Sequence, residues 1–163
     1  MPSKRSSRQF RQKGLFTIEF ALAALLLFTV IFLVFEYSRL LLTWNLLQES
    51  TRRGASVAAQ MTPGEGVTLE AVRRAALYGD SGSSRLVSGL KSGQVQVNYL
   101  DRNGDLVADP KTSSRIRFVQ VEIRGYRLKS LFPGLSPGLG QEVAAPVFST
   151  VMPGESLGRS PTL

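Results

Sequence analysis

The residue that stands out chemically is a single carboxylate in an apolar run. Glu19 lies near the start of Leu15–Phe35, where every other residue is uncharged. A carboxylate at the middle of a bilayer costs about 2.5 kcal/mol or more, so such a group usually has a partner or a function. Cleavage after Gly14 would place the α-amine of Leu15 one helical turn before Glu19. The amine and the carboxylate could then pair, within one chain or between parallel neighbours.

A simpler interpretation of Glu19 needs no cleavage. The side chain would lie one turn inside a membrane helix and extend to the cytoplasmic headgroups. The two interpretations differ in whether Glu19 can be replaced without loss of function.

Other chemistry finds little support. The chain has no cysteine and no histidine, which excludes disulfides, thiolate nucleophiles, imidazole acid–base catalysis and the usual zinc ligands. A serine–lysine dyad at Ser130 and Lys129 rests on adjacency alone, and there is no glycine-rich phosphate loop. We therefore predict neither an enzyme nor a cofactor.

One loop has the composition of a calcium site. Asp101, Asn103, Asp105 and Asp109 offer oxygen ligands at alternate positions. An EF-hand loop needs glycine at its sixth position and glutamate at its twelfth, whereas the glycine here is fourth. Asn103-Gly104 instead favours a two-residue hairpin turn. We predict a hairpin and no metal, with calcium as the alternative.

The net charge of +8 is unevenly distributed. Five cations and no acid precede Gly14, and the remaining 15 basic residues nearly balance 12 acidic ones. No basic patch with interleaved aromatic residues occurs, so we predict no nucleic-acid binding. The cations should instead hold the N-terminus in the cytoplasm and place the C-terminal part in the periplasm or outside the cell.

The apolar run has the length of a membrane span. Its roughly 21 residues would form a helix of about 30 Å, the thickness of a hydrocarbon core. A secretory signal peptide has a shorter apolar region and a small-x-small cleavage site, whereas this run ends in "VFEYSR". An uncleaved signal anchor stays open.

The segment around Glu19 resembles a known family. "KGLFTIEF" is similar to the processing site of type IV pilins and pseudopilins, with basic residues, Gly14 at the cut and glutamate at the fifth mature position. Residues 8–60 resemble TadE/TadF-type pseudopilins of the tight-adherence (Flp, type IVb) pilus. The aromatic residue after the glutamate is Phe20, and Glu36, Tyr37 and Arg39 form a second element at the membrane end.

The resemblance implies a function in pilus assembly. A prepilin peptidase would cut between Gly14 and Leu15, and Glu19 would pair charges during assembly. The mature chain would be a minor pilin or pseudopilin of the inner membrane, acting in pilus initiation, adhesion and biofilm formation. Its partners would be other pilin-like subunits, the assembly platform and membrane lipid. The alternative is an uncleaved bitopic protein with a partner-binding domain in an envelope or secretion complex.

The remaining sequence predicts an α+β fold. Residues 15–61 form a long helix, amphipathic beyond the membrane segment 15–35, which ends at the breaker "TPGEG". A short helix over 68–78 begins with Thr68 as its N-cap. Alternation predicts strands over 94–100 and 115–126 and an edge strand over 142–153, weakened by Pro146. These strands form a small antiparallel sheet packed on the C-terminal half of the long helix.

We expect four parts along the chain. Residues 1–14 are a basic leader, 15–61 the long helix, 62–153 a small extracytoplasmic α+β domain and 154–163 a flexible tail.

Overall fold

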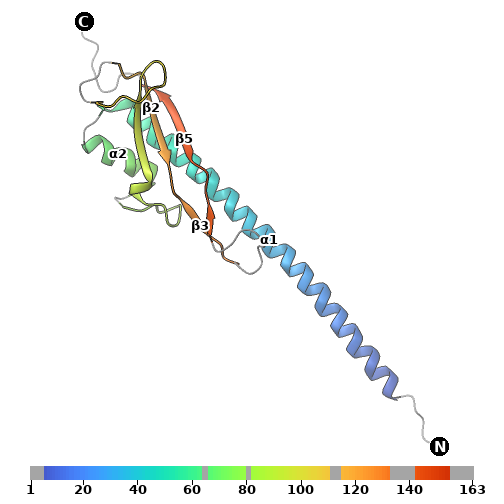
Figure 1. Ribbon diagram of the computed structural model, residues 1–163. Coiled ribbons are helices and arrows are strands. Elements are labelled where there is room, and N and C mark those ends of the chain that lie inside the picture. The colour runs from blue at the N-terminus through green and yellow to red at the C-terminus, as the bar shows by residue number, and fades with distance from the viewer. Residues whose placement is uncertain (1–5, 64–65, 80–81, 111–114, 133–141, 155–163) are drawn as a thin grey trace, which may run out of the picture. The chain divides into compact units, whose positions relative to one another are not determined.

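The computed structural model describes residues 6–63, 66–79, 82–110, 115–132 and 142–154. Within these ranges it describes the side chains from Gly14 onward, except that of residue 67. The element order along the chain is helix, helix, 3-10 turn and five strands (Figure 1). Their bounds are α1 Ser6–Gln60, α2 Gly66–Ala76, η1 Ser92–Gln94, β1 Val95–Leu100, β2 Phe118–Ile123, β3 Arg127–Lys129, β4 Glu142–Ala144 and β5 Phe148–Pro153. The fold is α+β, as predicted.

The chain divides into two compact units. The first comprises Met1–Arg39 and Ser130–Gln141, and the second comprises Leu40–Lys129 and Glu142–Leu163. Helix α1 contributes to both. It begins earlier than the predicted residue 15 and continues through Gly14, because the segment contains no proline and a single glycine does not break a helix.

The second unit contains a three-stranded antiparallel sheet with β2 at its centre. The strand order is β1-β2-β5, with Val121 opposite Val97 on one side and Thr150 on the other. Val119, Val121 and Ile123 are buried, as the alternating pattern predicted. A separate two-stranded sheet pairs β3 with β4.

The sheet packs on the part of α1 that lies in this unit (Figure 1). Leu47, Ala55 and Ala58 have no exposed surface and share one core with the β2 valines. A Cβ on Gly54 would lie 3.1 Å from Cγ1 of Val121 and 3.3 Å from Cβ of Ala76. Gly54 therefore lies where α1 passes close to β2 and α2, and a larger side chain there would press on both.

The predicted second helix is shifted by two residues. It covers Gly66–Ala76, so Thr68 is its third residue and not its N-cap. The Thr68 hydroxyl donates a hydrogen bond to the carbonyl of Thr62 at 2.9 Å. The prediction was wrong because that hydroxyl bonds to the chain beyond the end of α1 and caps no N–H.

The C-terminal strand differs from the prediction because proline interrupts it. Pro146 has no N–H to donate to a ladder, and the segment 142–153 divides into β4 and β5 on either side of it. β5 is an edge strand, as predicted. β3 was missed, since its three residues are too few to show alternation.

Glu122 follows the buried Val121 in β2 and is itself only 3% exposed. Its carboxylate accepts hydrogen bonds from Asn98 at 3.1 Å and Arg124 at 3.0 Å. These bonds compensate for the water that a buried carboxylate loses.

The predicted two-residue hairpin turn is wrong in register. The N–H of Gly104 donates to the carbonyl of Asp101 at 3.2 Å, so Arg102 and Asn103 are the central residues of the turn. Gly104 follows with a φ of 89°, a conformation that favours glycine. Beyond it, only an isolated bridge pairs Leu100 with Leu106.

Candidate functional site

The first unit presents a continuous apolar helix surface. Leu15, Phe20, Leu25 and Phe35 are each at least 65% exposed. Within the described residues, α1 is the one helix long and apolar enough to cross a membrane, and its apolar window is not buried at all. This assignment rests on the length and the composition of the helix. A signal sequence near the N-terminus would have the same two properties. An unburied surface of this size nevertheless needs lipid or protein around it.

The predicted processing site lies at the start of this surface. Gly14 and Leu15 are consecutive helical residues, and a Cβ built on Gly14 would meet no atom within 4 Å. Glu19 is exposed one turn beyond Leu15, with Phe20 68% exposed beside it. The helix therefore places the α-amine position and the carboxylate on the same face, as their spacing predicted.

The structure brings together two of the three residues in the second predicted element. The Glu36 side chain is 5% exposed, and its Oε1 accepts a hydrogen bond from Nη2 of Arg39 at 3.0 Å. The same oxygen accepts the backbone N–H of Leu131 at 3.2 Å. Tyr37 is 55% exposed and lies outside this cluster.

Sequence reasoning did not find the contact between Glu36 and Leu131. The two residues are 95 positions apart. Leu131 belongs to the glycine- and proline-rich stretch 129–140, whose composition predicts a loop and whose residues 133–140 lie outside the described part of the chain. No local pattern marks a backbone N–H as the partner of a distant carboxylate.

A second charged cluster lies on α1 in the other unit, beyond the apolar run. Glu49 accepts hydrogen bonds from Nε of Arg52 at 2.7 Å and Nε of Arg53 at 2.9 Å. These bonds, with that from Arg52 the stronger, lower the pKa of Glu49 to about 2. The Arg53 guanidinium also lies 4.5 Å from the ring centroid of Tyr78. All these groups are satisfied, and their arrangement stabilises the helix surface.

The loop considered for calcium uses its ligands internally. Oδ1 of Asp101 accepts the backbone N–H groups of Asn103 at 2.8 Å and Asp105 at 3.0 Å. In the part of the chain that the structure describes, no group of three or more acidic, histidine or cysteine side chains could hold a metal ion. Asp101 thus stabilises the turn through its own backbone.

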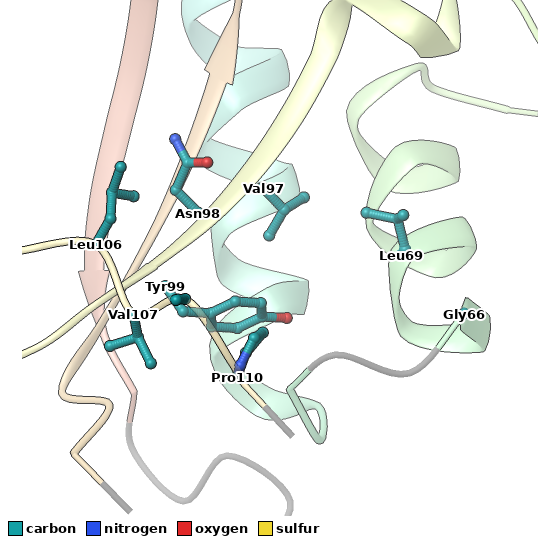
Figure 2. Close-up of a pocket in the computed structure, with 9 residues that line it drawn as sticks. Gly66, Leu69, Val97, Asn98, Tyr99, Leu106, Val107 and Pro110 are labelled. Atoms are coloured by element: carbon teal, nitrogen blue, oxygen red, sulfur yellow. The ribbon is translucent and has the colours of Figure 1, made fainter. Parts of the chain in front are cut away.

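A cavity of about 340 Å³ lies between α2, β1 and the segment that follows β1 (Figure 2). Its volume is at the lower end for small-molecule sites. Figure 2 shows Leu69 of α2 and Val97 of β1 on facing sides, with Tyr99 and Pro110 close to each other. The lining is mainly aliphatic, and its polar side chains are those of Asn98 and Tyr99.

One comparison with known proteins gave a match, and it covers part of helix α1. The model of the TadE-like protein family matches residues 14–56. Comparison with curated proteins and with solved structures gave no match. The family match confirms the resemblance over this segment. The match relates the chain to Tad pilus proteins that have an N-terminal apolar helix. The TadE-like family is a family of structural proteins and not of enzymes.

Proposed function

We propose that this protein is a minor pilin or pseudopilin of a tight-adherence (Flp, type IVb) pilus. A prepilin peptidase cuts it after Gly14, and the mature chain acts in pilus initiation, adhesion and biofilm formation. The leader, residues 1–14, stays in the cytoplasm. Residues 15–35 span the inner membrane, and the α+β domain, residues 62–153, lies outside the cytoplasm.

One observation carries this proposal. The TadE-like match covers residues 14–56, which contain Gly14, Glu19 and the exposed apolar side chains of α1 from Leu15 to Phe35. In this proposal the glycine junction is the substrate of a peptidase, and the carboxylate one turn later pairs with a partner helix. The unburied apolar helix needs lipid or a filament around it. A soluble enzyme would need none of these features.

Pairing of Glu19 with an N-terminal amine gives the proposed site its chemistry. The amine exists only after cleavage, so processing creates the cation that neutralises the acid in an apolar environment. Pilin-like subunits and the assembly platform are the proposed protein partners. Helices packed in parallel would use the pair to set their axial register.

The alternative function is an uncleaved bitopic membrane protein whose outer domain binds a partner in an envelope or secretion complex. The same apolar surface supports it, and processing separates the two. The test is the intact mass of the protein extracted from membranes of its own cells. The pilin proposal expects a chain beginning at Leu15, and a chain beginning at Met1 would support the alternative.

A further inference from the structure

Leu131 and Phe132, which follow β3, contact the end of the apolar run. Glu36 lies one residue beyond that run, and its Oε1 accepts the N–H of Leu131 at 3.2 Å. One turn earlier on α1, the Phe32 ring lies 5.0 Å from the ring of Phe132, centroid to centroid. A carboxylate and an aromatic ring of α1 therefore hold these two consecutive residues.

These contacts leave a large apolar side chain uncovered. Leu131 is 63% exposed although it lies beside the most apolar part of the chain. The Phe132 ring contacts Phe32, which in turn stacks with Phe28 on α1 with centroids 6.5 Å apart. Leu131 and Phe132 thus add apolar side chains beside the exposed apolar surface of α1.

We propose that Leu131 and Phe132 form a second membrane contact, inserted at the outer boundary between acyl chains and headgroups. This proposal rests on the membrane placement in the proposed function. A helix over 15–35 is about 30 Å long, so Phe32 and Glu36 lie at its outer end, at the level of that boundary. The segment held there meets the lipid surface that surrounds the helix.

Glu36 is a positioning residue for this contact. A backbone N–H that enters hydrocarbon without a hydrogen-bond acceptor is strongly destabilising. The Glu36 carboxylate accepts the N–H of Leu131, and Arg39 compensates its charge at 3.0 Å. Together they make an irregular backbone compatible with the edge of the bilayer.

Lipid explains the exposure better than a folded partner does, because the apolar surface of Leu131 is continuous with that of the spanning helix. A neighbouring pilin-like subunit is the competing occupant. If lipid shields Leu131 from water, the shielding does not depend on how much protein is in the membrane. If a neighbouring subunit shields Leu131, the shielding does depend on it.

The test uses the absence of native cysteine. Leu131→Cys in the full chain is labelled with an environment-sensitive nitrobenzoxadiazole probe and reconstituted in phosphatidylethanolamine/phosphatidylglycerol vesicles. The matched control is Leu106→Cys, whose leucine is 69% exposed on another loop. Leu25→Cys reports insertion of the helix.

We expect the probe at position 131 to emit at shorter wavelength and to be quenched by shallow doxyl-lipids. Its iodide quenching constant should be roughly fivefold smaller than at position 106, because a group at the acyl boundary is shielded from water. Equal iodide quenching at 131 and 106, with position 25 in lipid, would overturn the proposal and leave the membrane placement intact. Exposure at position 25 would contradict both. Protection at 131 that disappears on dilution with lipid would assign the surface to a neighbouring subunit and overturn the lipid contact.

Two substitutions test the role of Glu36. Glu36→Ala removes the acceptor, so iodide quenching at 131 should rise toward the value at 106. Glu36→Gln keeps an oxygen acceptor for Leu131 and should restore most of the protection. In both variants the probe at position 25 should be unchanged, which separates local release from loss of insertion. Unchanged protection at 131 in Glu36→Ala would show that Glu36 does not position the segment.

Discussion

At the residue scale, Gly14 and Glu19 have separate tasks in the proposed function. Gly14 is open on all sides, so nothing in the fold requires a glycine there. The reason for glycine would lie outside the chain, in the close approach of a protease to the backbone. Glu19 would act later, in contact with another charged group.

The first prediction concerns Gly14→Val. A side chain at the junction should obstruct the peptidase, so the variant should keep its leader and its intact mass should begin at Met1. The fold should be unaffected, since a Cβ at this position meets no atom within 4 Å. Ala21→Val, in the same apolar run, is the matched control and should be processed normally. Normal shortening of Gly14→Val would remove the processing interpretation.

The second prediction concerns Glu19→Gln. The substitution keeps the size and removes the charge, so the variant should insert at least as well as the wild type and should still be cut. It should fail to cross-link with other pilin-like subunits, because the pair with the N-terminal amine is lost. Processing by mass and capture by cross-linking are measured in the same cells.

Glu49→Gln is the matched control for Glu19→Gln, since Glu49 is ionised but lies beyond the apolar run. It should cross-link normally. If Glu19→Gln is cut, captured and incorporated into pili as well as this control is, the acid serves only to reach the headgroups. The pilin proposal would then rest on Gly14 alone.

At the element scale, helix α1 has two different environments along its length. Its residues from Gly14 to Phe35 are mostly exposed, whereas Leu47, Ala55 and Ala58 are fully buried against the sheet. The contribution of a leucine to stability should therefore depend on its position along one continuous helix.

The third prediction compares Leu47→Ala with Leu42→Ala. Leu47 has no exposed surface, so its truncation should lower the free energy of unfolding by about 2–5 kcal/mol. Leu42 is 59% exposed, and its truncation should change that free energy by less than about 0.5 kcal/mol. Urea unfolding of the full chain in detergent, followed by fluorescence of its single tryptophan, Trp44, measures both. Equal effects would mean that the sheet does not pack on this part of α1.

At the scale of the whole molecule, charge asymmetry should determine the orientation in the membrane. The five cations before Gly14 should stay in the cytoplasm, and the chain beyond about Arg39 should be exported.

The fourth prediction follows from that asymmetry. Alkaline phosphatase fused after Leu163, which is active only outside the cytoplasm, should be active. Replacing the leader cations Lys4, Arg5, Arg8, Arg11 and Lys13 with glutamine should reduce that activity several-fold, because the bias that orients the helix is removed. The corresponding glutamine changes at Lys91 and Lys129, beyond the membrane segment, are the control. Activity of a cytoplasmic reporter fused at the same site would contradict the orientation.

Local features of the sequence determined the membrane-length helix, the candidate processing site and the main strands of this protein. The length and apolarity of residues 15–35, the junction at Gly14 and the acid at Glu19 are readable because each depends on neighbours within a few turns of one helix. The strands around Val97 and Val121 were predicted for the same reason, since alternation is a local property. The TadE-like match covers this segment and continues along α1 to residue 56.

The tertiary structure decided which distant segments meet. It pairs Glu36 with Leu131 across 95 positions, divides the segment 142–153 between two sheets and buries the charged side chain of Glu122. Such contacts form because the whole chain must bury its apolar surface and satisfy its polar groups at once. A window of a few residues carries no information about how the whole chain meets these two requirements. The partners of Glu36 and Glu122 are therefore visible only in the folded molecule.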